Sequence, residues 1–286
     1  MKTPGTEPTR KRVRDGRKMR HPYAVWLLWP LRWAYKTWLA LVFFGSMVLL
    51  YPPFKFLLYA PHRYNAAFRL KRIWAGFLQW AGMFPARIEQ LAPLPDGAFV
   101  ICSNHGSYLD IIGMYNVMPR YFLFMGKNEL RRWPLFRIFF KDMNISVDRG
   151  SRTGAARAFM RAAQAINNGT SIAIFPEATI PDHSPRMKAF KDGAFRLAIE
   201  KQVPIVPITF LDHWRRMGEP MEFLGRACPG ISRVVIHPPI VTRGLTDADM
   251  VDLRRTVFRT IERPLLDAWQ ADETSKPLQE EDHDAG

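Results

Sequence analysis

The segment AFVICSNHGSYLDIIGMYNV, residues 98–117, carries the clearest signal of the fold class. It opens with a short continuous apolar run, 98–103, which is typical of a strand buried on both faces. A polar turn follows, and residues 108–117 then suit a helix with Ser107 as its N-cap. A buried strand, a turn and a helix in this order are the building unit of a parallel α/β sheet.

The same alternation continues toward the C-terminus. Further strands are predicted at 121–125, 145–148, 171–176, 204–211 and 233–241. Helices are predicted at 128–143 (broken at Pro134), at 152–169 (ending at Gly169), at 190–202 and from Thr246, with Asp249 at the capping-box position. We therefore expect a mostly parallel mixed sheet flanked by helices, over residues 81–270.

The charge of the chain is strongly uneven. The net charge of the 286 residues is +15. Residues 1–100 hold 16 Lys or Arg against 4 Asp or Glu, and the last 16 residues are acidic. A basic, aromatic-rich N-terminal third suggests an anionic partner, for which nucleic acid and anionic lipid both qualify. The two cysteines form no disulfide framework, and Cys102 suits a small core position.

An apolar segment in this N-terminal third favours lipid over nucleic acid. Residues 37–54 carry no charge, although Pro52 and Pro53 should end or sharply bend a helix near Tyr51. Positive charge lies on both sides, whereas a single span concentrates it on one. We therefore expect a helical hairpin that enters one leaflet, with a single span and a buried helix pair as alternatives.

The predicted parts are a basic disordered arm (1–22), the membrane-associated hairpin (23–80), the α/β domain (81–270) and an acidic tail (271–286).

Polar side chains follow three of the predicted strands. These are NHGSYLD (104–110), DRGSR (148–152) and PEATIP (176–181). Functional groups of parallel sheets gather beyond the carboxyl ends of strands, so we expect the three loops at one edge. In the first loop, Asp110 can accept from Nδ1–H of His105 and leave Nε2 as a general base. An ordinary turn histidine beside a helix-capping aspartate is the alternative.

The remaining polar residues leave several roles open. Arg149 suits a phosphate ligand or a structural ion pair, and Glu177 suits loop organisation or substrate contact. The sequence lacks a G-x-S-x-G elbow, metal-ligand spacing and phosphate-binding glycine loops. A His–Asp pair without a nucleophile of its own fits activation of a hydroxyl on the substrate.

Four blocks in fixed order resemble the glycerophospholipid acyltransferases, most closely the 1-acylglycerol-3-phosphate acyltransferases. The family's N-H-x-x-x-x-D is matched by Asn104, His105 and Asp110, and its D-R block by Val147, Asp148 and Arg149. Its F-P-E-G-T-R is matched in part at 175–179, and its V-P-I-V-P fully at 203–207. The segment MGKNEL (125–130) also resembles the family.

The resemblance implies a fold, a reaction and a set of site residues. His105 would deprotonate the hydroxyl of a lysophospholipid acceptor, with Asp110 orienting the ring, and acyl-CoA or acyl carrier protein would donate the acyl group. Substrate contacts are implied for a larger set, namely Asn104, Lys127, Arg149, Glu177 and Thr179. The expected product is phosphatidic acid, made at the cytoplasmic face of a membrane. No metal, other cofactor or nucleic-acid partner is expected.

One departure from the family pattern bears on the acceptor. Ile180 stands where the family has the arginine thought to bind the acceptor phosphate. Either Arg186 or Lys188 supplies the charge instead, or the acceptor is another lyso-lipid, such as a lyso-ornithine lipid. A non-catalytic membrane-surface protein that binds lipid is the alternative outside enzymology.

Overall fold

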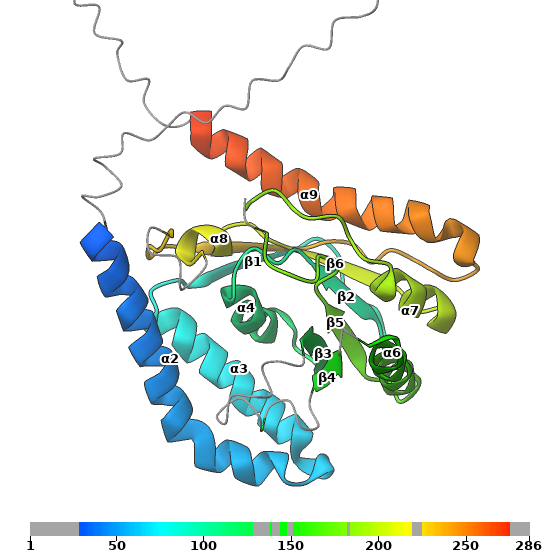
Figure 1. Ribbon diagram of the computed structural model, residues 1–286, viewed down its shortest axis with the longest axis horizontal. Helices are drawn as coiled ribbons and strands as arrows, with labels where there is room; N and C mark the ends of the chain where they lie inside the picture. Colours follow the sequence, from blue (N-terminus) through cyan, green and yellow to red (C-terminus); the bar gives the residue numbers. More distant parts are fainter. Residues whose placement is uncertain are drawn as a thin grey trace, which may run out of the picture.

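A seven-stranded sheet runs through the middle of the molecule (Figure 1). The computed structural model describes residues 29–127, 138, 144–147, 151–181, 184–218 and 225–274. The strands are β1 (Ala86–Gln90), β2 (Val100–Ser103), β3 (Phe122–Lys127), β4 (Asn144–Val147), β5 (Ser171–Ile174), β6 (Ile205–Phe210) and β7 (Ser232–Ile236). Their order across the sheet is β1-β7-β6-β2-β5-β3-β4. The strand predicted first in the chain, β2, therefore lies at the centre.

The sheet is parallel except at one junction. Only the described β6 and β7 pair antiparallel, and β2 pairs parallel with both β5 and β6. This arrangement confirms the predicted mostly parallel α/β class. The sequence did not reveal β1, the edge strand paired with β7. Four of its five residues are exposed, so the strand carries no apolar run to detect.

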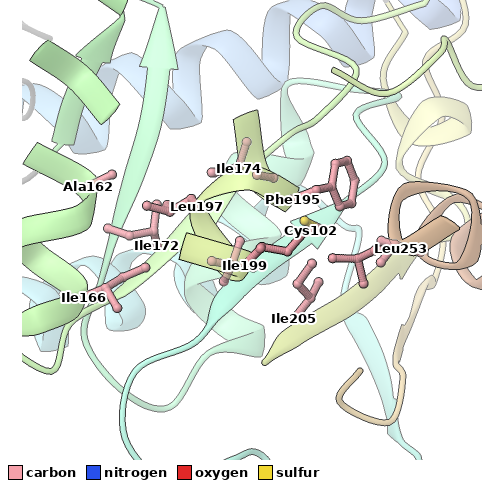
Figure 2. Packing of buried hydrophobic residues seen from close by; sticks show 14 of the residues in the cluster. Cys102, Ala162, Ile166, Ile172, Ile174, Phe195, Leu197, Ile199, Ile205 and Leu253 are labelled. Carbon is pink, nitrogen blue, oxygen red and sulfur yellow. The ribbon is translucent and has the colours of Figure 1, made fainter. Parts of the chain in front are cut away.

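The core alternates between the two faces of the sheet. Val100 and Cys102 of β2 belong to a cluster on one face, and Ile101 belongs to a cluster on the other. This alternation follows from the two-residue period of a strand. Figure 2 shows Cys102 packed among Ile172, Ile205 and side chains from the helices of its face. Cys102 is fully buried, and burial raises the pKa of its thiol, which confirms its assignment as a core residue.

Helices cover both faces. On one face lie α6 (Arg152–Asn167), α7 (Gly193–Lys201) and α9 (Met250–Thr274); on the other lies α4 (Leu109–Val117). Ser151 caps α6 by accepting from Gly154 N–H. The predicted capping box of Thr246 and Asp249 is present in the short helix η3 (Asp247–Asp249) ahead of α9. The predicted helix at 128–143 falls, apart from residue 138, outside the described residues.

Two antiparallel helices precede the sheet. They are α2 (Trp29–Leu58) and α3 (Tyr64–Ala81), joined through the short helix η1 (Pro61–Arg63). Trp38 Nε1–H of α2 donates to the carbonyl of Ala81 (2.8 Å), and Trp74 Nε1–H of α3 donates to Ser46 Oγ (2.8 Å). The predicted helical hairpin is therefore present. Helix α2 continues through Pro52 and Pro53 and bends along its length (Figure 1), so the prolines do not end it.

The outer surface of this hairpin is apolar. Helix α2 is long and apolar enough to cross a membrane, judged by length and composition alone, and most of it is not buried in the protein. Its exposed large side chains include Leu31, Leu41, Phe44, Val48, Leu49 and Phe56, and those of α3 include Ile73, Phe77 and Trp80. Exposed apolar side chains in this number on two packed helices suit contact with a membrane or another protein.

Candidate active site

His105 lies just beyond the carboxyl end of the central strand β2. Because β5 and β6 pair with β2 on its two sides, the loops after both strands flank the histidine. The loop after β5 supplies Phe175, whose ring stacks on the His105 ring at a centroid distance of 4.1 Å and an angle of 13°. The side chain of His105 is 13% exposed. The ring is thus held from one side while one edge stays within reach of solvent.

The predicted contact between His105 and Asp110 is present. Nδ1 of His105 lies 3.1 Å from Oδ2 of Asp110, in the first turn of α4. The same oxygen accepts from the backbone N–H of Ser107 at 2.9 Å. Ser107 Oγ also accepts from Leu109 N–H (3.1 Å), although the N-cap position itself belongs to Tyr108. The turn therefore brings the carboxylate back onto the ring, as the five-residue spacing predicts.

Asp110 is ionised despite complete burial. Burial by itself would raise the pKa of this carboxyl, but hydrogen bonds from His105 and His213 outweigh it and hold the pKa below its usual range. A carboxylate beside Nδ1 keeps the proton on that nitrogen. Within the described residues no group bonds to Nε2 of His105, so its lone pair is available to a substrate.

Glu177, three residues after the end of β5, joins two loops at this edge. Its Oε1 accepts from the backbone N–H of His105 (2.8 Å), and its Oε2 accepts from the backbone N–H of Lys188 (2.7 Å). Burial raises the pKa of Glu177 to about 7, and the two N–H donors limit the rise. Of the two roles left open by the sequence, loop organisation is the one with visible contacts. Substrate contact by this residue stays a prediction.

The turn after Glu177 contains a strained residue. Ala178 has a φ of +68°, in the left-handed region that side chains with a Cβ rarely adopt. It occupies the position at which the resembled family has glycine. A glycine would adopt this φ without steric cost, whereas the Cβ of Ala178 makes it unfavourable.

Asn104 ties the site to the neighbouring strand β6. Its Nδ2 donates to the carbonyl of Phe210 (3.0 Å), and its Oδ1 accepts from the N–H of Phe210 (2.8 Å). The side chain is buried at 3% exposure. These bonds occupy both ends of the amide, so the visible role of Asn104 is to position the loop. These bonds do not test the predicted contact between Asn104 and the substrate, which stays a prediction.

The two cations proposed to replace the family arginine lie in different places. Lys188 Nζ donates to the carbonyl of Ile180 (3.0 Å) and to Oγ1 of Thr179 (3.2 Å). Its ammonium group thus lies on the loop that lacks the arginine. Arg186 instead lies over the ring of Trp269 in α9, with 5.9 Å between the guanidinium carbon and the ring centre. Lys188 is therefore the better placed of the two.

The structure does not show whether two other predicted substrate contacts, Lys127 and Arg149, reach this edge. Lys127 ends β3, which runs parallel to β5, and its backbone pairs with Val147 of β4. Arg149, two positions beyond Val147, lies outside the described residues, as does Asp148. In the described ranges, no three His, Cys, Asp or Glu side chains are grouped so as to hold a metal ion.

The sequence prediction missed one residue of this site, His213. Its Nδ1 lies 2.8 Å from Oδ1 of Asp110, and its side chain is 1% exposed. It stands at the start of α8 (His213–Arg216), three residues after β6 ends. The available signal was its place in LDHWRR, a polar segment that also follows the carboxyl end of a strand.

Comparison with known proteins agrees with this fold and these motifs. Residues 86–211 match the family model described as Acyltransferase. This part of the chain is therefore similar to the acyltransferase family.

More particularly, the chain is similar to 1-acyl-sn-glycerol-3-phosphate acyltransferases. It is 34% identical over 187 residues to the alpha form of Homo sapiens, which covers 58% of this chain and 61% of that protein. A putative 1-acyl-sn-glycerol-3-phosphate acyltransferase of Caenorhabditis elegans, acl-2, is 28% identical over 205 residues, 69% of this chain and 71% of that protein. The chain spans about three fifths of the length of the mammalian relatives it matches.

A solved structure shares the fold. The 1-acyl-sn-glycerophosphate acyltransferase PlsC of Thermotoga maritima superposes with a TM-score of 0.65 at 20% identity, covering 89% of this chain and 99% of that one. The likeness therefore includes the N-terminal helices as well as the sheet.

Proposed function

We propose that this protein transfers a fatty acyl group from an acyl thioester to the free hydroxyl of a 1-acylglycerol-3-phosphate, giving phosphatidic acid. The observation that carries the proposal is the contact between His105 and the buried Asp110 at the carboxyl edge of the sheet. The similarity to acyltransferases of this specificity supports the choice of reaction.

The residues suit a reaction without a covalent enzyme intermediate. Nε2 of His105 removes the proton from the acceptor hydroxyl, while Asp110 stabilises the imidazolium that forms. The alkoxide oxygen attacks the thioester carbonyl, and a tetrahedral intermediate forms. Its collapse breaks the carbon–sulfur bond, and the imidazolium returns its proton to the departing thiolate. The base is thereby regenerated without any cofactor.

The proposed acceptor carries a phosphate, for which this edge of the sheet offers cations. Lys188 lies on the loop after β5. By sequence, Lys127 is the last residue of β3 and Arg149 comes two residues after β4, and we propose that both side chains contribute. Ammonium and guanidinium groups are the usual protein ligands of phosphate. Acyl-CoA and acyl carrier protein both present the required thioester, and we propose one of them as donor.

The hairpin of α2 and α3 would hold this edge at a membrane. Both the acceptor and the product are lipids, and the exposed apolar side chains of α2 and α3 suit the acyl region of a bilayer. Insertion into one leaflet from the cytoplasmic face is our proposal for the topology, because basic residues flank both ends of the apolar segment.

The test is acyl transfer by membranes that contain the protein. Labelled acyl-CoA or acyl carrier protein is supplied together with a panel of lyso-lipids that includes lysophosphatidate and a lyso-ornithine lipid. We expect transfer to lysophosphatidate that His105→Ala abolishes, whereas His62→Ala, at an exposed histidine in η1, leaves it unchanged. Transfer confined to the phosphate-free acceptor would overturn the proposed substrate, and full activity of His105→Ala would overturn the catalysis.

The same assay tests the cation on the loop after β5. Lys188→Met should raise KM for lysophosphatidate by roughly tenfold to a hundredfold with little change in kcat, because one charged contact is worth about 1.5–3 kcal/mol. Arg186→Met is the matched control and should change KM much less, since its guanidinium lies over Trp269. Equal effects of both substitutions would contradict the placement of Lys188.

A further inference from the structure

The two oxygens of Asp110 are held by different parts of the chain. Oδ2 accepts from His105 and from the backbone of Ser107, both in the loop after β2. Oδ1 lies 2.8 Å from Nδ1 of His213, which is 103 positions away in sequence. Within the described residues, His213 is the only hydrogen-bond partner of Oδ1. Both oxygens of the carboxylate are thus hydrogen-bonded, each by a different segment of the chain.

The surroundings of His213 fix its tautomer. Its ring stacks on Phe210 (centroids 4.8 Å apart, 20° between planes) and meets Phe84 edge-on at 6.5 Å. Nε2 is buried and has no hydrogen-bond partner in the described part of the chain. Because the only partner of the ring is an ionised carboxylate, the ring proton lies on Nδ1 and is donated to Oδ1. An apolar residue would fill this space without a buried, unpaired nitrogen, so packing alone does not explain a histidine.

The sheet holds His213 in place from two directions. Asp212 accepts from Nε (2.7 Å) and Nη2 (2.8 Å) of Arg233 and from its backbone N–H (2.9 Å), which ties the start of α8 to β7. Asn104 holds the backbone of Phe210 at the end of β6. The donor to Oδ1 is therefore carried by a rigid frame, as a group that orients another side chain must be.

We propose that His213 is a positioning residue for the acyl transfer: its Nδ1–H holds Oδ1 of Asp110 so that Oδ2 stays directed at Nδ1 of His105. The proposal rests on the proposed function for the reaction, but the contact itself needs no substrate. Without this donor, Oδ1 is buried with no partner, and the carboxylate either turns away from His105 or takes up a proton. In either case the His105 imidazolium loses the Asp110 carboxylate that stabilises it.

Two substitutions of similar size separate donation from packing. His213→Asn keeps an N–H donor near the position of Nδ1, and His213→Leu does not. We expect His213→Leu to lower kcat by roughly tenfold to a hundredfold with KM nearly unchanged, because a hydrogen bond to a charged group is lost. His213→Asn should recover most of that loss. Equal kcat values for the two variants, both folded, would overturn the proposal.

The pH profile gives a readout that a packing role would not change. The ionisable groups around Asp110 are His105, His213 and, on the neighbouring loop, Glu177. Loss of a donor destabilises the Asp110 carboxylate, so the acidic limb of kcat/KM should move to higher pH by about 1–2 units in His213→Leu. In His213→Asn the limb should stay within about half a unit of wild type. An unmoved limb in the leucine variant would count against positioning.

A third variant leaves every hydrogen-bonding group in place. A Cβ added at Gly113 of α4 would lie 2.5 Å from Cε1 of His213, so Gly113→Ala should displace the ring and lower kcat. Gly76→Ala in α3 is the matched control, since its nearest atom lies 4.0 Å away. Unchanged kcat in a folded Gly113→Ala protein with a displaced His213 ring would contradict the proposal.

A measurement without turnover separates this inference from the proposed function. The low-field ¹H NMR resonance of the His105 ring N–H should shift or broaden in His213→Leu and remain in His213→Asn. If the wild type transfers no acyl group but this pattern holds, the positioning stands and the proposed reaction fails. If acyl transfer is found and the resonance is the same in both variants, the proposed reaction stands and the positioning fails.

Discussion

Ala178 offers a test of the backbone geometry behind the site. Its φ of +68° lies in the left-handed region, between Glu177, which supports the His105 loop, and Thr179. Glycine adopts this conformation without steric cost because it has no Cβ. Ala178→Gly should therefore stabilise the protein, although the substitution removes a methyl group.

The expected gain follows from two opposing terms. A residue with a Cβ pays about 1–2 kcal/mol in the left-handed region. About 0.5–1 kcal/mol of this gain is lost again, because a glycine makes the unfolded protein more flexible and so more stable in entropy. The net increase in the free energy of unfolding should be about 0.5–1 kcal/mol, which corresponds to a rise in Tm of about 1–4 °C for a chain of this size.

Thermal unfolding of the detergent-solubilised protein measures this gain. Ala156→Gly is the matched control, because Ala156 is exposed within helix α6. There the same substitution should lower stability by about 1 kcal/mol. The reasoning predicts opposite signs at the two positions. A fall in Tm at position 178 comparable to that at position 156 would refute the left-handed strain.

Three further substitutions test other parts of the site and fold. Asn104→Leu removes both bonds to the Phe210 backbone and should lower the free energy of unfolding by about 2–4 kcal/mol in denaturant titration; a loss under 1 kcal/mol would contradict the clamp. Glu177→Gln turns an amide NH₂ toward a backbone donor, so kcat should fall about tenfold; unchanged kcat would show that the bridge is dispensable. Because burial raises the pKa of Glu177 from 4.5 to about 7, its contribution to stability is lost as pH rises through that window, and the variant should lack this decline. Burial lowers the pKa of His237 from 6.5 to about 4, so its contribution is lost as pH falls between those values. The stability advantage of wild type over His237→Gln should then shrink by about 1–2 kcal/mol from pH 7 to pH 4, and a constant difference would contradict the burial of a neutral ring.

Local patterns in the sequence were enough to predict many of the strands and helices. The apolar run before Asn104 predicted the buried strand β2, because a strand between two helix layers needs apolar side chains on both faces. The alanine-rich segment ending at Gly169 predicted α6, whose buried positions lie on one face. Strand β1 escaped prediction because it lies at the edge of the sheet, where its exposed side chains follow no apolar pattern.

The pair at the centre of the site was also readable from sequence. His105 and Asp110 are five residues apart, and a turn followed by a helix start returns the carboxylate to the ring. Both residues lie within one short segment, so their contact depends on local geometry. The order of the four motifs then added what a single short motif lacks, namely specificity.

Local periodicity and short spacing were enough to predict the α/β class and to favour the apolar N-terminal hairpin and the His105–Asp110 contact. The groups around that contact became known only from the folded chain. The order β6-β2-β5 places Glu177 on one side of His105 and His213 on the other side of Asp110. These partners are 72 and 103 positions away. Strand order is set by packing and backbone pairing across the whole sheet, and no local pattern records it.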